Sequence, residues 1–187
     1  MQLKMYRPAE LGKPEAKIAE GFTIREMVPG EEADWAYSCY TSFGVETITP
    51  EHYERMMAHD EGVRMCDVFF ACKDGKPVGT ATARTDDKGD PFLHFIAVHP
   101  DFRGHKLAMP LMVAVINRHL EMGREGCFLT TDDWRVPAVK SYLNLGYLPV
   151  LWSDDARERW EKMLRIYGIK SCKAYNADMT PADDIIA

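Results

Sequence analysis

The sequence lacks any long hydrophobic run, and this absence excludes a transmembrane helix. In its 187 residues no apolar stretch approaches the roughly 18 residues that a helix needs to cross a bilayer. The N-terminal segment is polar and contains Pro8 and Pro14, so it also lacks the apolar centre of a signal peptide. We therefore expect a cytoplasmic protein without a membrane partner.

Positive charge is also in short supply. The chain has 23 Lys and Arg against 29 Asp and Glu, for a net charge of −6. Proteins that bind nucleic acids usually present an excess of basic surface, so we expect no nucleic-acid partner. An acidic surface of this kind attracts small cationic substrates instead.

Paired cysteines are missing as well. The five cysteines are odd in number and form neither a CxxC pair nor a cluster with histidine. Cys66 and Cys72 share one side of an expected strand, but two ligands without a second pair do not make a zinc site. We predict reduced thiols and no metal.

What is present is enough apolar material for one core. A hydrophobic fraction of 46% and a charged fraction of 28% are typical of an ordinary globular protein, and the length suits one domain. Residues 1–20 mix proline, glycine and charge without periodicity, and we interpret them as an N-terminal arm. The domain is expected to span residues 21–187.

Strands and helices alternate along this domain. Period-2 patterns predict strands at 22–27, 92–98, 127–131 and 147–151, and a hairpin at 66–85 whose turn contains Asp74-Gly75. Helical spacing and first-turn signals predict helices at 31–40, after Pro50, at 107–120, from Pro137 to Gly146, and at 155–167. This order predicts a mixed α/β fold with helices on both faces of the sheet.

Residues 92–108 join a buried strand, a short turn and the start of a helix. The first turn of a helix leaves main-chain N–H groups without partners, and its dipole adds positive potential there. Arg103, Lys106 and the turn amides therefore predict a site for a diphosphate. Pro110 is tolerated only in a helix's first turn, so the helix should begin just after the turn.

Two motifs in this region and beyond resemble the GCN5-related N-acetyltransferase superfamily. The family's loop reads Gln/Arg-x-x-Gly-x-Gly/Ala, and residues 103–108 read Arg-Gly-His-Lys-Leu-Ala, with Lys106 at the family's glycine. Residues 138–147 are similar to the family's Ala-x-x-x-Tyr-x-x-x-Gly-Phe/Tyr pattern. The resemblance covers roughly residues 22–151.

The resemblance implies a central, mostly antiparallel sheet, acetyl-CoA as cosubstrate, and transfer of the acetyl group to an amine by direct attack in a ternary complex. It also implies the residues that bind the cofactor. The main chain of the strand would hold the pantetheine, and the loop would hold the diphosphate. Arg135 stands where the family commonly has an asparagine near the pantetheine. The full set of implied cofactor-binding residues is Ile96, Ala97, Val98, Arg103, Gly104, His105, Lys106, Leu107, Ala108 and Arg135.

Amine acylation also needs a base. An alkylamine with a pKa near 10.4 is neutral in only about one molecule in 2,500 at pH 7, a handicap of roughly 4–5 kcal/mol. His94 lies within an apolar strand, on the face that we assign to Phe92, Ile96 and Val98, and imidazole suits this role. In the arylalkylamine acetyltransferases, a histidine occupies what looks like the same strand position as His94. The alternative is a histidine that only packs in the core.

The leaving thiolate needs a proton, and Tyr142 matches the family's tyrosine for that step. Its alternative role is an aromatic anchor on the inner face of a helix. In the resembled family the first two helices choose the acceptor, and here Tyr40, Phe43 and Glu46 are the candidate substrate residues, although aromatic residues at helical spacing also suit a core.

Other functions remain open. Transfer of a longer acyl group is one, and a catalytically silent CoA-binding or regulatory module is another, for which Lys106 would mark a degenerate loop. A binder of some other phosphate ligand would leave the Tyr142 motif unexplained. The acceptor is a small-molecule or peptide amine, and the sequence leaves its identity and a homodimer open.

Overall fold

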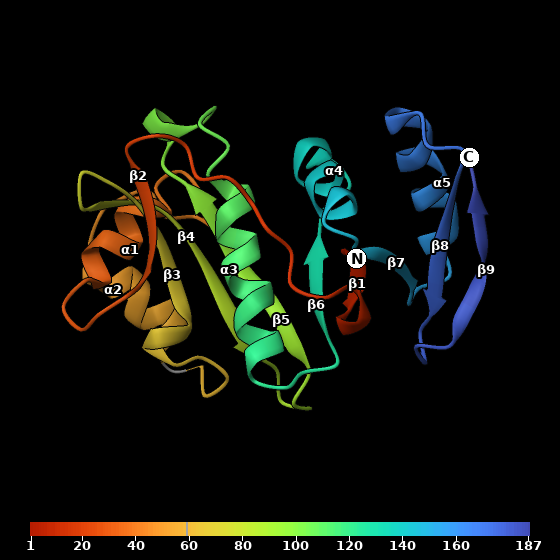
Figure 1. The fold of residues 1–187 in the computed structure, drawn as a ribbon, viewed down its shortest axis with the longest axis horizontal. Coiled ribbons are helices and arrows are strands. Elements are labelled where there is room, and N and C mark those ends of the chain that lie inside the picture. The colour runs from red at the N-terminus through yellow and green to blue at the C-terminus, as the bar shows by residue number, and fades with distance from the viewer. Residues whose placement is uncertain (59) are drawn as a thin grey trace. The chain divides into compact units, whose positions relative to one another are not determined.

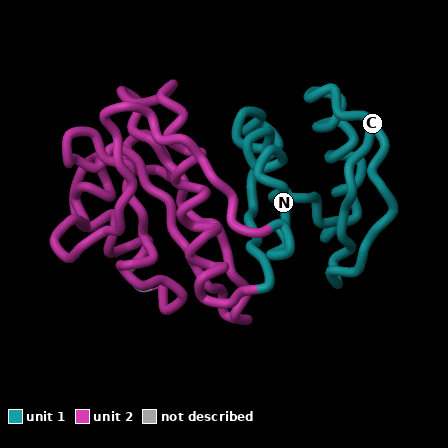
Figure 2. Tube along the Cα trace, viewed as in Figure 1, with its two compact units in different colours: residues 1–11, 125–187 teal, residues 12–124 magenta. Residues whose placement is uncertain are grey.

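The computed structural model describes residues 1–58 and 60–187 of the chain. They divide into two compact units, of which unit 1 comprises residues 1–11 and 125–187 and unit 2 comprises residues 12–124 (Figure 2). The described residues form nine β-strands and five α-helices, together with short 3-10 and π-helical segments (Figure 1). The fold is therefore mixed α/β, as the sequence predicts.

Unit 2 contains a four-stranded antiparallel sheet in the order β2-β3-β4-β5. Its strands are β2 (Phe22–Glu26), β3 (Val68–Lys73), β4 (Lys76–Thr85) and β5 (Pro91–Val98). Its helices are α1 (Glu32–Ser38), α2 (Pro50–Tyr53), the π-helical η2 (Glu54–Ala58), the 3-10 segments η3 (Met65–Asp67) and η4 (Pro100–Phe102), and α3 (Ala108–Glu121).

Helices cover both faces of this sheet (Figure 1). On one face Trp35 of α1 and Tyr53 of α2 belong to the same buried cluster as Phe70 of β3. On the other face α3 approaches so closely that a Cβ atom added to Gly79 would lie 3.4 Å from Leu111 Cδ1. A glycine on β4 thus gives the helix room to pack against the strand.

The predicted turn between β3 and β4 is confirmed. Asp74 and Gly75 adopt φ values of 49° and 84°. Two consecutive left-handed residues match the twist of the flanking strands, which is why an Asp-Gly pair favours a hairpin. The short loop fixes the register of β4 relative to β3. Strand β5 pairs with the other edge of β4.

Unit 1 contains a five-stranded sheet in the order β6-β1-β7-β8-β9, in which only β7 and β8 are paired in parallel among the described residues. Its strands are β1 (Leu3–Pro8), β6 (Gly126–Thr131), β7 (Leu148–Leu151), β8 (Ser171–Asn176) and β9 (Pro181–Ile186). Its helical segments are the 3-10 turn η1 (Ala9–Leu11), α4 (Val136–Asn144) and α5 (Ala156–Tyr167).

Three strands of unit 1 were not predicted from the sequence. Strand β1 lies in the segment interpreted as an arm, yet it pairs with β6 on one side and β7 on the other. Strands β8 and β9 form a hairpin after the last predicted helix. The division of the chain at residues 20 and 21 stays a prediction.

No helix in the described part of the chain is both long enough and apolar enough to cross a bilayer. The five cysteines are free thiols, and Cys39, Cys72 and Cys127 are buried. Burial raises the pKa of the Cys39 thiol far above its usual value, because a thiolate would lose its hydration there. This thiol is therefore protonated at neutral pH.

Candidate functional site

Strand β5 carries a β-bulge where it pairs with β4. Thr80 pairs with Ala97 and Thr82 pairs with His94, so the single residue between the two threonines faces two residues of β5. Phe95, the first of those two, has a φ of 47°, which is unusual for a residue with a Cβ. A bulge leaves one residue outside the regular ladder and bends the strand.

The bulge corrects one prediction about His94. The expected face of Phe92, Ile96 and Val98 assumed an unbroken alternation along the strand. Instead the extra residue reverses the alternation, and the register puts His94 and Ala97 on the same face, that of α1 and α2. Val98 pairs with Gly79 and belongs to the α3 face.

His94 lies mostly buried, with its ring 4.1 Å from that of Phe95 between centroids. Burial first, and then the positive charge of Arg84, lower its pKa to about 4, while Asp60 acts in the opposite direction. Arg84 and Asp60 themselves form an ion pair. His94 is therefore a neutral imidazole at neutral pH and has an open site for a proton.

The turn after β5 contains two residues with a positive φ. Gly104 has a φ of 88° and Lys106 has a φ of 58°, so the lysine keeps the left-handed conformation for which the family uses glycine. Helix α3 begins at Ala108, with Pro110 in its first turn as expected. The lysine thus does not prevent a left-handed conformation at this position.

Main-chain donors in this turn are free for a ligand. Within the described residues, no group accepts a hydrogen bond from the main-chain N–H of Gly104, His105, Lys106 or Leu107. Gly104, His105 and Lys106 are exposed, whereas the Leu107 side chain is buried and anchors the end of the turn. Unpaired N–H groups ahead of a helix form an anion site.

Arg103 braces this turn. Its Nε donates to the Val98 carbonyl oxygen at 3.3 Å, and one terminal nitrogen donates to Thr41 Oγ1 at 3.1 Å. The guanidinium thus links the end of β5 with the turn after α1. These contacts hold the side chain against the protein, and the predicted role of Arg103 in cofactor binding stays a prediction.

His99 is a site feature that the sequence analysis missed. Its buried ring is stacked on Tyr37, with centroids 4.1 Å apart and an angle of 10° between the planes, and also on Tyr40 at 5.6 Å. Its Nδ1 accepts a hydrogen bond from the Asp101 N–H. The sequence offered one signal for this stack: Tyr37 and Tyr40 are three residues apart, as on one face of a helix, and His99 directly precedes Pro100.

The candidate acceptor residues fall in two different settings. Tyr40 belongs to the His99 stack, and Phe43 packs edge-on against Phe95 at 4.8 Å. Glu46 is exposed. Phe43 therefore lies at the bulge, next to Phe95 and His94. Tyr40 contacts His99 just after β5 and so helps to pack the end of α1 there.

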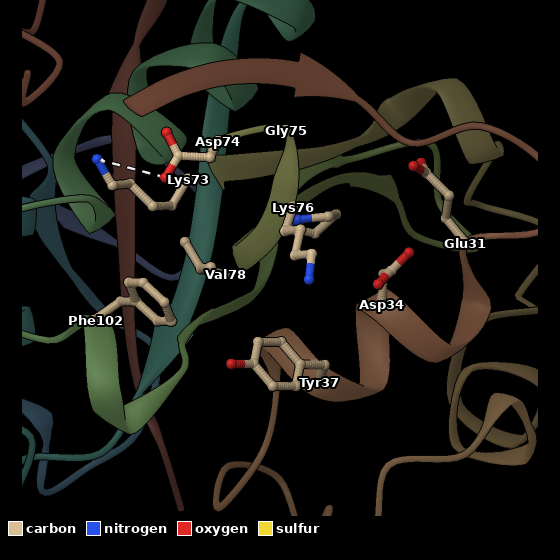
Figure 3. A pocket seen from close by; sticks show the side chains of 10 residues that line it. Glu31, Asp34, Tyr37, Lys73, Asp74, Gly75, Lys76, Val78 and Phe102 are labelled. Atoms are coloured by element: carbon tan, nitrogen blue, oxygen red, sulfur yellow. Dashed lines mark ion pairs between the residues drawn. The ribbon is translucent and has the colours of Figure 1, made fainter. Parts of the chain in front are cut away.

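A pocket of about 810 Å³ lies between the β3–β4 turn, α1 and η4 (Figure 3). Tyr37 and Phe102 form part of its wall, and the Asp34 carboxylate and the Lys76 ammonium both point into it (Figure 3). Burial raises the pKa of Asp34, and the nearby charge of Glu31 raises it further. The lining mixes apolar side chains with charged groups of both signs.

Tyr142 and Arg135 belong to unit 1. Tyr142 lies on α4, where its ring meets that of Tyr147 edge-on at 6.1 Å. Burial raises the pKa of Tyr142 to about 12, although the charge of Arg135 opposes that shift. Arg135 precedes α4, lies over the Trp134 ring at 4.7 Å and pairs with Asp132 at 3.4 Å.

Comparison with known structures identifies the same fold in several acetyltransferases. A GCN5-related N-acetyltransferase from Sphaerobacter thermophilus has 22% identity and a TM-score of 0.67, over 79% of this chain and 48% of that one. A tandem GNAT protein of the clavulanic acid pathway has 14% identity and a TM-score of 0.62, over 79% and 50%. The ribosomal-protein-S18-alanine N-acetyltransferase of Escherichia coli has 19% identity and a TM-score of 0.53, over 67% and 76%.

The match to the first two structures spans about half of their length. No curated protein sequence matches the chain. The sequence model described as the acetyltransferase (GNAT) family matches residues 31–147, which include α1, the bulged β5, the diphosphate turn and α4. The match covers more than half of the chain, and the protein therefore belongs to the GNAT acetyltransferase family.

Proposed function

We propose that this protein transfers the acetyl group of acetyl-CoA to the amine of a small molecule or peptide, in the cytoplasm. One observation carries the proposal: the turn at residues 104–107 keeps its left-handed conformation and offers unpaired N–H groups directly after the strand that bears His94. A degenerate loop would have lost this geometry at Lys106. The left-handed turn supports CoA binding, and the family match over residues 31–147 supports an enzyme over a silent CoA-binding module.

The residues of the turn fit a diphosphate. The N–H groups of Gly104, His105, Lys106 and Leu107 are the main-chain donors, and the Lys106 ammonium adds a positive charge in an exposed loop. Ala108 begins the helix whose dipole favours an anion there. In this proposal the main chain of Ile96, Ala97 and Val98 binds the pantetheine, and Arg135 contacts the same arm.

The reaction forms a bond between the amine nitrogen and the thioester carbon and breaks the bond between that carbon and sulfur. As the new bond forms, the nitrogen becomes positively charged and far more acidic, so a weak base can take its proton. His94 fills this role because burial and Arg84 keep its imidazole neutral. A main-chain N–H near the bulge stabilises the developing oxyanion, and we assign this role to Val98.

The leaving sulfur takes its proton from Tyr142 in this scheme. Burial raises the pKa of this phenol to about 12, so it carries its proton throughout the neutral range. A group that must donate has to be protonated before the step begins. The assignment rests on the motif of residues 138–147, and Tyr142→Phe removes the proton while it keeps the ring.

A thiol-release assay tests the proposal. Acetyl-CoA is offered with a panel of alkylamines, polyamines, amino sugars and peptides with a free N-terminal alanine, the last because the Escherichia coli relative is an alanine N-acetyltransferase. We expect amine-dependent release of thiol for at least one class. We expect His94→Gln to reduce kcat about 100-fold or more, the usual contribution of a general base.

Binding is measured in parallel by calorimetry with CoA. If CoA binds but no amine stimulates thiol release, the silent-module alternative replaces the proposal. If thiol release requires a longer acyl-CoA, the acyl group is corrected and the roles of the residues are kept. Unchanged turnover in both His94→Gln and Tyr142→Phe would refute the assigned chemistry.

A further inference from the structure

Thr82 of β4 faces His94 of the neighbouring strand β5 in unit 2. The register aligns Val68 of β3, Thr82 of β4 and His94 of β5 in one row across the sheet. Directly opposite residues of antiparallel strands have Cβ atoms about 4.5–5.5 Å apart and project to the same side. The side chain on the other flank of Thr82 is apolar, so the imidazole is the polar group opposite its hydroxyl.

The Thr82 hydroxyl is buried and has no fixed partner in the described protein. Its side chain has 0% exposure, and no described group makes a hydrogen bond with Oγ1. A buried hydroxyl without a partner is unfavourable, and such groups normally bond to a neighbour or to an ordered water. The His94 ring is the nearest group in this row that has both a donor and an acceptor nitrogen.

We propose that Thr82 is a positioning residue for the base, joined to His94 by a hydrogen-bonded link at most one water long. This inference rests on the proposed function. The link selects one tautomer of the neutral ring, so that the other nitrogen is open to the amine proton. When His94 accepts that proton, the hydroxyl accepts a hydrogen bond from the imidazolium, and Thr82 itself neither gains nor loses a proton.

The charged groups near His94 have opposite effects on a positive charge at its ring. Arg84 of β4 opposes a positive charge on the ring, and Asp60, which precedes β3, is the group that favours it. Cys39 and Tyr53, which belong to the buried cluster on this face, both have raised pKa values caused by burial and are neutral at pH 7. Asp60 is already paired with Arg84, so a polar contact from Thr82 adds support that these neighbours do not provide.

The chain offers a matched control two residues away. Thr80 lies on the same face of β4, is also fully buried, and has a hydroxyl without a partner among the described residues. Its neighbours across the sheet are Phe70 and Ala97, neither of which can form a side-chain hydrogen bond. Valine at either position keeps the shape of threonine and removes the hydroxyl.

The experiment compares Thr82→Val, Thr82→Ser and Thr80→Val in the full chain. The nitrogen chemical shifts of the His94 ring are measured by NMR at pH 7.5 and assigned with His94→Gln. We expect one dominant tautomer in the natural protein, Thr82→Ser and Thr80→Val, and a mixture in Thr82→Val. With an amine that supports turnover, we expect kcat to fall about tenfold in Thr82→Val, while Thr80→Val stays within about twofold.

The two readouts separate this inference from the proposed function. If no amine is acetylated, the tautomer of His94 still tests the link. If the nitrogen chemical shifts of the His94 ring are the same in Thr82→Val and Thr80→Val, the link does not exist, whatever the turnover of the two variants. Equal loss of turnover in both valine variants, with equal shifts, would assign the effect to packing and overturn the proposal.

Discussion

At the scale of single residues, Lys106 shows how a substitution at a motif glycine can be tolerated. The left-handed conformation costs a residue with a Cβ roughly 1–2 kcal/mol, and Lys106 adopts it with a φ of 58°. The lysine is exposed and its ammonium can approach an anion. In the proposed diphosphate site, the charge of Lys106 would offset this cost in backbone strain.

Two substitutions of Lys106 separate strain from charge. Lys106→Ala removes the ammonium and keeps the Cβ, whereas Lys106→Gly removes both. We expect Lys106→Gly to be about 1 kcal/mol more stable to urea than Lys106→Ala, since only glycine adopts this φ freely. We expect both variants to bind CoA more weakly by a similar factor of up to about five, as for the loss of one exposed ionic contact.

Calorimetry with CoA and urea unfolding provide the measurements. A CoA affinity in Lys106→Ala equal to that of the natural protein would show that the ammonium does not reach the ligand. Equal stability of the two variants would show that the turn carries no strain at this position.

His94 should also make stability depend on pH. Its pKa is lowered to about 4 in the folded protein, against about 6.5 in an unfolded chain, so the unfolded state binds more protons between these values. The stabilisation is therefore complete above pH 6.5 and is lost as the pH falls toward 4. The shift corresponds to a loss on the order of 3 kcal/mol at most.

Urea unfolding at pH 7 and at pH 4.5, for the natural protein and His94→Gln, measures this effect. We expect the natural protein to lose more stability than the variant over this range. His119, which burial also shifts toward a lower pKa, remains in both proteins and cancels in the comparison. An equal loss of stability between pH 7 and pH 4.5 in the two proteins would show that His94 titrates normally and is more exposed to water than the structure indicates.

At the scale of elements, the strands and helices between residues 22 and 151 follow from the sequence because each has a local signal. The Asp74-Gly75 turn, the helix-starting Pro137 and the apolar run at 92–98 all lie where the structure has the expected element. The bulge in β5 has no such signal, because Phe95 is a poor residue for a left-handed φ. The neighbours Trp35 and Phe43, which pack edge-on against its ring, are distant in sequence.

The strands that were missed have weak or misleading patterns. Strand β1 alternates Leu3, Met5 and Arg7 on its buried side, and an arginine does not suggest a buried position. The hairpin of β8 and β9 is mostly exposed, so it lacks a continuous apolar face. Tertiary contacts, which the sequence does not display, decide these elements.

Arg7 explains how β1 is held in unit 1. Its side chain is 4% exposed, and Nε donates to the Leu145 carbonyl oxygen at 2.7 Å, directly after α4. A cation at the C-terminal end of a helix is favoured by the helix dipole. Burial lowers the pKa of Arg7, but the guanidinium remains charged at any physiological pH.

We expect Arg7→Met to destabilise the protein by about 1–3 kcal/mol, because it leaves the Leu145 carbonyl unpaired in a buried position. Lys162→Met on α5 is the control, since its ion pair with Glu158 is exposed and worth at most about 1 kcal/mol. Urea unfolding compares the two. A smaller loss in Arg7→Met than in Lys162→Met would contradict this account of β1.

At the scale of the whole molecule, the family and with it the family's cosubstrate were accessible from the sequence, whereas the surroundings of His94 were not. The motifs at 103–108 and 138–147 are contiguous segments, so their residues can be identified from spacing alone. Asp60 and Arg84, which act on the pKa of His94, come from the segment before β3 and from β4, and Thr82 of β4 lies opposite His94 in the register. Their proximity depends on the register of β4 and β5 and on the bulge, which only the structure defines.

The net charge of −6 gives the last prediction, because it acts on the two substrates in opposite directions. The acidic surface attracts a cationic acceptor over a screening length of about 30 Å at 0.01 M salt but of only about 8 Å at 0.15 M salt. The same surface repels the anionic CoA at long range. Among acceptors that are turned over, we expect kcat/KM for a diamine to fall several-fold between about 0.01 and 0.15 M salt, and that for the matched monoamine to fall less. Initial rates at fixed acetyl-CoA test this, with a neutral inert osmolyte in place of salt as the control. Equal salt dependence of the two amines would mean that the acceptor meets no net negative field, and the acidic surface would then have no role in substrate capture.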